Sequence, residues 1–178
     1  MQPIDVLEFW FGRDRKDWFA KNDAFDAELR TRFLATYESA AAGKLSDWEA
    51  TPEGALALTI VLDQFPRNMF RHDPRAFAAD ATARAVAERA IARGFDSQFP
   101  PAERSFFYLP FEHSEAMADQ ERCCALFRAM GDADLLHWAE LHADIIRRFG
   151  RFPHRNAALG RSTTPAEKSF LDNDGFAG

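Results

Sequence analysis

The chain has 178 residues, a mass of 20.2 kDa and 47% hydrophobic residues, which suits one folded domain with a sizeable core and excludes a disordered chain. Its formal net charge of −6 argues against non-specific nucleic-acid binding, because that binding needs a basic surface. No apolar stretch has the length of a membrane span, and the N-terminus lacks the basic region of a signal peptide.

The only two cysteines, Cys123 and Cys124, are adjacent and allow no disulfide framework. We therefore expect a reducing, cytoplasmic location. Their neighbours Ala125 and Leu126 indicate a packing role in mid-helix rather than a nucleophile.

In chain order, a short amphipathic helix is predicted from Ile4 to Phe11. A longer helix, capped by Asn22 or Asp23, should then run to about Ala42. Its aromatic and aliphatic residues recur at helical spacing and should form one face. Ser46 and Glu49 have the spacing of a capping box.

The run 55–62 is apolar on every side, which predicts a central, fully buried helix. Thr51-Pro52 provides its cap and a proline at the first helical position. A buried strand is the alternative for such a run. The leading Ala and Leu residues and the helix-start signal favour the helix.

The second half predicts five further helices from similar signals. They start at Asp73-Pro74, at Pro101 (with an interruption at Pro110), at Ser114, at Asp132 and at Thr164-Pro165. The first ends near Arg93-Gly94, the third near Gly131 and the fourth at Gly150. Thr164 and Glu167 again have capping-box spacing.

Together these elements predict an all-α fold with essentially no β-strand, in a single helical domain covering 1–178. From about Pro52 onward, helices of similar length are joined by short turns, which favours antiparallel pairs in a tetratricopeptide-like arrangement. The consensus pattern of that repeat is not present. A compact irregular bundle is the alternative.

Two long predicted helices close with the same Phe-Pro/Arg-Asn ending, 65–68 and 152–156. Pro66 should bend or stop its helix and leave carbonyls that need donors, which the following Arg and Asn can supply. One interpretation is that each ending caps its helix. The other is that both converge on one cavity.

Asp63 is the first polar residue out of place, because it follows eight uncharged residues on a helix expected to be buried. A buried carboxylate needs a partner. Arg67 fits at i+4 only if the helix survives Pro66, and Arg151 or Arg155 fits as well. Such a pair can be architecture or the wall of a site.

His142 lies in an apolar stripe of its helix. It can be a core histidine, or a base or ligand that a carboxylate orients. At a helix junction, His113, Ser114 and Glu115 are suited to acid/base chemistry, although a cap explains Ser114 and the helix dipole favours Glu115. The basic run containing Arg151, Arg155 and three other arginines suits anion recognition or a helix C-terminus.

No cofactor motif is present, and we predict no metal. His113, Glu115, His142 and His154 are suitable ligand types, but they match no known metal spacing.

Over nearly its whole length the chain resembles the bacterial domain-of-unknown-function family 924. The segments that carry the resemblance are 5–12, Trp18-Phe19 with Lys21, 58–68, 75–78 with Asp80, 108–111 with 113–115, 120–122, 148–156 and 159–161. Glu112 and Thr163 depart from the family's pattern. The resemblance implies an all-helical, tetratricopeptide-like fold and no known activity.

The leading hypothesis is a polar cavity that binds a small anionic ligand, with His142 or His113 as base if there is chemistry. A scaffold that binds a peptide or protein partner is one alternative, and a metal-dependent hydrolase is another. The predicted ligand-binding residues are Asp63, Gln64, Arg67, Asn68, His113, Glu115, His142, Arg151, His154, Arg155 and Asn156.

Overall fold

A computed structural model describes residues 1–15, 18 and 20–173, and within them every regular element is helical. Phe19, one of the residues that carry the family resemblance, lies outside the described residues. The predicted all-α class is confirmed. No described helix combines the length and the apolar content that a membrane crossing needs.

The chain divides into two compact units, which are described separately. The first comprises residues 1–71 and 75–110, and the second comprises 72–74 and 111–178. The prediction of a single domain, like that of tetratricopeptide-like pairing, stays a prediction.

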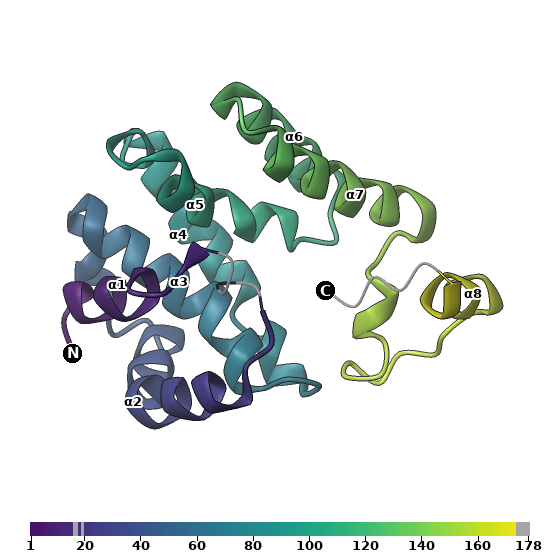
Figure 1. Cartoon of the computed structure of the whole chain (residues 1–178), viewed down its shortest axis with the longest axis horizontal. Helices are drawn as coiled ribbons and strands as arrows, with labels where there is room; N and C mark the ends of the chain where they lie inside the picture. Colours follow the sequence, from purple (N-terminus) through teal and green to yellow (C-terminus); the bar gives the residue numbers. More distant parts are fainter. Residues whose placement is uncertain (16–17, 19, 174–178) are drawn as a thin grey trace. The chain divides into compact units, whose positions relative to one another are not determined.

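The first unit is built around one buried helix (Figure 1). Its elements are α1 (Pro3–Phe11), α2 (Asp23–Ala41), η2 (Ser46–Ala50), α3 (Pro52–Met69), α4 (Asp80–Ala92) and η4 (Asp96–Gln98). η3 (Pro74–Phe77) and α5 (Pro101–Glu112) cross the boundary between the units. Helices α1, α2 and α4 all pack against α3.

Helix α3 forms where the sequence predicts it. Thr51 accepts a hydrogen bond from the Gly54 amide at 3.1 Å, and Pro52 occupies the first helical position. Every residue from Gly54 to Pro66 is buried, as an apolar surface on all sides requires. Phe65 packs on Trp10 and Phe33, with ring centroids 5.7 and 5.2 Å away respectively, and these ring contacts form part of the core.

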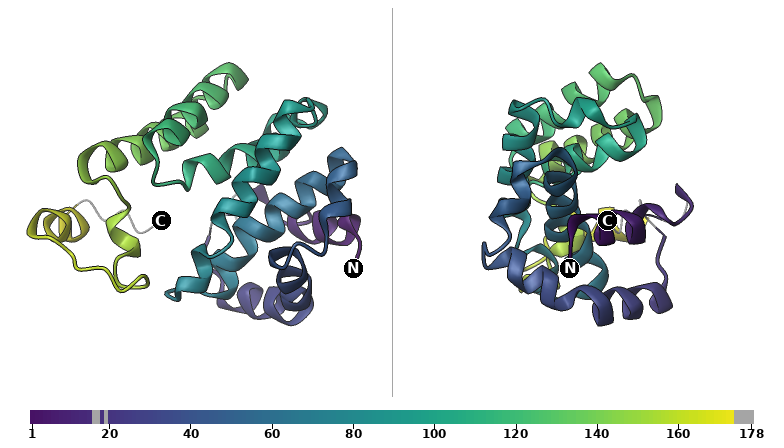
Figure 2. Two further views of the ribbon diagram at one scale, coloured as in Figure 1. Left: turned by 180° about the vertical axis from the view of Figure 1, so that it is seen from behind. Right: turned by 90° about the vertical axis from the view of Figure 1, so that its left-hand side faces the viewer.

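The second unit contains α6 (Met117–Met130), α7 (Ala133–Phe149), η5 (Pro153–Arg155) and α8 (Pro165–Asn173). Helices α6 and α7 lie side by side from both viewing directions (Figures 1 and 2). The turn between them follows the predicted signals, because Gly131 adopts the left-handed conformation and Asp132 caps α7.

Four boundaries differ from the prediction. Pro74 opens only the short η3, and α4 begins at Asp80. The predicted capping box at Ser46 makes no side-chain cap. Helix α5 continues through Pro110 to Glu112 without interruption. Ser114 does not cap α6, which begins three residues later; its hydroxyl accepts from the Ala116 amide and donates to Asp119.

Candidate functional site

The two Phe-Pro endings have different local structures. Of the predicted bend or stop at Pro66, the stop is wrong, because helix α3 continues through the proline and ends at Met69. Helix α7 instead ends at Phe149 with Gly150 as its C-cap, whose φ of 68° is left-handed, and Pro153 then starts η5. The difference arises because a glycine precedes only the second proline. The endings also belong to different units.

Because α3 survives Pro66, Arg67 lies one turn after Asp63 and pairs with it. Arg67 Nη1 lies 3.2 Å from Asp63 Oδ1, and it donates to the Asp63 carbonyl at 2.6 Å. The guanidinium also makes two hydrogen bonds, of 2.9 and 3.0 Å, to the Asp80 carboxylate. Arg67 therefore donates a hydrogen bond to a carbonyl of its own helix, as predicted. Through Asp80 it also links α3 to α4.

Gln64 and Asn68 complete this polar group. Gln64 donates to Asp63 Oδ2 at 2.6 Å. Asn68 donates to Asp26 of α2 at 2.8 Å, and not to a carbonyl of the described residues; Arg71 binds the same carboxylate. The predicted ligand residues of the first ending thus have partners within their own unit.

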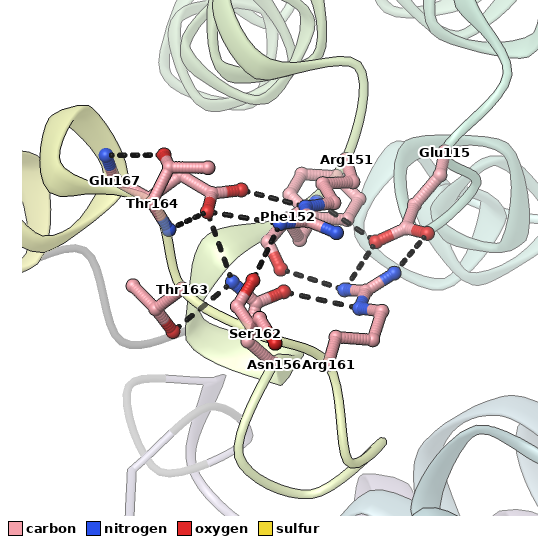
Figure 3. Close-up of polar contacts among 9 residues, drawn as sticks. All are labelled: Glu115, Arg151, Phe152, Asn156, Arg161, Ser162, Thr163, Thr164 and Glu167. Atoms are coloured by element: carbon pink, nitrogen blue, oxygen red, sulfur yellow. Dashed lines mark hydrogen bonds and ion pairs between the residues drawn. The ribbon is translucent and has the colours of Figure 1, made fainter.

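The second ending is fixed by a dense set of polar contacts (Figure 3). Glu115 accepts from both terminal nitrogens of Arg161, at 2.8 and 3.0 Å, and from the Phe152 amide at 2.8 Å. Burial alone would raise the pKa of Glu115, but the hydrogen bonds and the charges of Arg161 and Arg155 outweigh burial and lower it.

Glu167 anchors the other half of these contacts (Figure 3). It accepts from Arg151 at 2.6 and 2.9 Å, and it forms the predicted capping box with Thr164. The hydrogen bond from Arg151, with those from Thr164, lowers the pKa of Glu167 to about 2 although burial opposes the shift. Asn156 joins the two halves, because its amide donates to Glu167 at 3.3 Å and accepts from Arg161 at 3.0 Å.

Three basic side chains surround the fully buried ring of Phe152. The His142 ring meets it edge-on with centroids 5.7 Å apart, and the His154 ring lies 5.5 Å away. The guanidinium carbon of Arg155 lies 4.6 Å from the ring centroid. We call these four residues with Glu112 the Phe152 cluster.

His142 is oriented by its own helix and by a carboxylate. Its Nδ1 lies 2.8 Å from the Trp138 carbonyl and 3.5 Å from Glu112 Oε1, and both side chains are buried. Because a carbonyl oxygen and a carboxylate oxygen both accept hydrogen bonds, we assign the ring hydrogen to Nδ1. In the neutral ring Nε2 is then the basic nitrogen.

The end of α5, which carries Glu112, is held by side chains. Gln120 is fully buried and donates to the carbonyls of Glu112 and Ser114, both at 2.6 Å. Arg155 donates to the intervening carbonyl of His113 at 3.0 Å. A helix end leaves carbonyls without helical partners, and these two side chains satisfy them.

The structure therefore brings the seven predicted residues of the second unit into one neighbourhood around Phe152 and the contacts of Figure 3. Sequence reasoning missed four participants: Glu112, Gln120, Arg161 and Glu167. Glu167 was recognised only as a cap. No local sequence pattern predicts the contact between Glu112 and His142, because the two residues lie on different helices.

A cavity of about 410 Å³ lies along α6 and α7, lined by Met117, Cys124, Ala143 and charged residues.

Both cysteines are buried, and burial raises the pKa of each thiol, in agreement with the predicted packing role. Among the described residues, no group of three or more His, Cys, Asp or Glu side chains is arranged to hold a metal ion.

Comparison with known proteins gives a family but no activity. The model of the family described as "Bacterial protein of unknown function (DUF924)" matches residues 6–175. A solved structure of a protein of unknown function from Agrobacterium tumefaciens is 44% identical, covers 96% of each chain and superposes with a TM-score of 0.92. No curated protein matches significantly. The chain therefore belongs to the DUF924 family of bacterial proteins of unknown function.

Proposed function

We propose that the second unit binds a small anionic molecule, carboxylate or phosphate, at the Phe152 cluster. The observation that supports this proposal best is the concentration of His142, His154 and Arg155 on one buried ring. A guanidinium and the N–H groups of histidine donate hydrogen bonds to anions, and an arrangement of three such side chains suits an anion that they can share.

Among the arginines, Arg155 is the one we assign to the anion. Arg151 and Arg161 are each engaged with both oxygens of one carboxylate, Glu167 and Glu115 respectively. Arg155 is held against the Phe152 ring and by the His113 carbonyl. These contacts position a guanidinium whose planar fork suits a two-oxygen ligand.

His142 is the residue that we assign as a base. Its Nδ1–H is directed at the Trp138 carbonyl and the Glu112 carboxylate, so Nε2 would take a proton and Glu112 would stabilise the resulting imidazolium. This is the arrangement of a carboxylate-oriented general base, without an assigned substrate.

Thermal unfolding with increasing phosphate tests the binding proposal, with sodium chloride at equal ionic strength as reference. We expect an anion-dependent rise in Tm, since a ligand that binds only the folded state stabilises it. Arg155→Gln should abolish the rise. Arg128→Gln, at an exposed position of the same unit, should retain it.

A rise that persists in Arg155→Gln would contradict the assignment, and so would no rise in the wild type. Because Arg155→Gln removes a helix-end contact, circular dichroism should first confirm that it folds. His142→Gln provides a second variant. It should lower the anion response while leaving the Arg155 contacts in place.

The ligand roles of Asp63, Gln64, Arg67 and Asn68 stay predictions, as do the cytoplasmic location, the absence of a nucleic-acid partner and the partner-binding scaffold. The metal-dependent hydrolase gains no support from the described side chains.

A further inference from the structure

Three N–H groups in the first unit are buried without a hydrogen-bond acceptor among the described residues. They are Trp10 Nε1, Arg13 Nη1 and Trp18 Nε1. The Trp10 side chain is fully buried, and Trp18 is 8% exposed. Burying a donor without an acceptor costs free energy, because the donor loses its hydrogen bonds to water. A native protein leaves few such groups, so three in one short segment call for an explanation.

These donors belong to one aromatic cluster. Phe25 contacts both Trp10, at 6.0 Å between ring centroids, and the Arg13 guanidinium, whose carbon lies 3.5 Å from the ring centroid. Phe106 contacts both indoles, at 5.9 Å from Trp10 and 5.2 Å from Trp18. Two phenyl rings therefore link all three donor-bearing side chains.

Arg13 also lines a cavity of about 360 Å³ beside α1. The other lining residues are Asp5, Glu8, Phe9, Gly12 and Arg32. Phe9 stacks on Phe25, with centroids 5.2 Å apart and an interplanar angle of 12°. The cavity is thus lined by charged side chains, among them the Arg13 guanidinium, and by the Phe9 ring, which joins it to the aromatic cluster through Phe25.

We propose that this cluster is a binding site for the carboxylate of a small organic monoanion with an apolar body. The three groups are donors only, so their complement is an acceptor such as a carboxylate, which can accept several hydrogen bonds at once. Arg13 supplies the charge and the two indoles supply neutral donors. The Phe rings offer contact area to the apolar body.

The charges select a monoanion over a phosphate dianion. Arg13 is the cation of the cluster, whereas Arg32 is paired with Glu28 at 3.0 Å and stacked on Phe9. Asp5 and Glu8 on the rim would repel a second negative charge. This site is independent of the Phe152 cluster, which lies in the other unit.

Tryptophan fluorescence tests the proposal, because Trp10 and Trp18 are among only four tryptophans in the chain. The full-length protein is titrated with butyrate and phenylacetate, and with inorganic phosphate for comparison. We expect a saturable change with the carboxylates and none with phosphate. Arg13→Gln should weaken the apparent affinity about tenfold or more, since it removes a charge-assisted hydrogen bond.

Three further variants make the result specific. Trp18→Phe removes one donor but keeps an aromatic ring, so it should weaken binding while Trp10 still reports it. Trp138→Phe removes an exposed indole of the second unit and should change nothing. Arg155→Gln should also leave the titration unchanged, which separates this site from the proposed function.

An absent carboxylate response in the wild type would overturn the proposal. A response of equal strength in Arg13→Gln would do the same, as would a phosphate response that depends on Arg13. If Arg13→Gln proves unfolded by circular dichroism, the Trp18→Phe variant decides: an affinity equal to that of the wild type rejects the site.

Discussion

Asp63 and Arg67 form an ion pair across one turn of α3, at 3.2 Å, although Pro66 stands between them. The Asp63 side chain is 1% exposed. Burial by itself lowers the pKa of Arg67, but the charges of Asp63 and Asp80 and the hydrogen bond to Asp80 outweigh burial and raise it. The guanidinium is therefore held charged between two carboxylates.

Replacing Arg67 with Met should lower the free energy of unfolding by about 3–5 kcal/mol, because it leaves the Asp63 charge buried without this cation. Urea unfolding at neutral pH measures the change. Arg89→Met is the matched control, since Arg89 also makes two hydrogen bonds to a carboxylate, Glu49, but is 55% exposed. Its cost should not exceed about 1 kcal/mol. Equal costs would show that burial does not set the strength of the Asp63 pair.

The Glu167 carboxylate should make stability depend on acid pH. Its folded pKa is lowered to about 2 from an ordinary value of 4.5, so its contribution is complete above pH 4.5 and is lost as pH falls toward 2. Urea midpoints of wild type and Glu167→Gln should differ most near pH 6 and converge as pH falls toward 2. A constant difference across this range would contradict the assignment. Glu115, whose pKa is also lowered, should leave residual acid sensitivity in the variant.

Gly54 should be intolerant of alanine despite lying in a helix. A methyl group there would overlap the Trp48 carbonyl oxygen and approach the Thr51 hydroxyl to 3.0 Å. Overpacking against backbone costs about 1–3 kcal/mol and should exceed the helix-propensity gain of about 1 kcal/mol. Gly54→Ala should therefore lower Tm, whereas Glu53→Ala at the exposed preceding position should scarcely change it. A more stable Gly54→Ala would show that η2 moves aside.

Gln120→Met should destabilise the second unit by about 1–3 kcal/mol. The variant keeps the side-chain volume but leaves the carbonyls of Glu112 and Ser114 without their donor. Part of the loss is offset, because Gln120 Oε1 has no hydrogen-bond partner among the described residues. Denaturant unfolding should show the effect, with Glu121→Ala as an exposed control on the same helix. A neutral Gln120→Met would mean that other donors reach these carbonyls.

Local signals predicted most helix ends. The Asn22, Thr51, Asp132 and Thr164 caps all accept the expected amide hydrogen bonds. Each depends on residues at most three positions apart, so a single sequence contains the whole interaction.

The prolines misled the prediction where they lie near a helix end. Pro66 and Pro110 both sit inside the last turn of their helices. There a proline removes one backbone hydrogen bond, and the burial of neighbours such as Phe65 and Phe111 outweighs that loss. Ser114 does not act as the predicted cap. Its segment is positioned by side chains further along the chain, because Gln120 donates to the Ser114 carbonyl and Arg155 donates to the His113 carbonyl.

By itself, the sequence determined the helical class, the buried character of α3 and the family, because periodicity, caps and long motifs are written in neighbouring residues. It also marked Asp63 and His142 as polar groups out of place. Only the tertiary structure decided their partners. Arg67 pairs with Asp63 because buried packing carries α3 past a proline, and Glu112 meets His142 because two helices pack together. Pairings of this kind depend on which surfaces bury each other, and no local pattern records that.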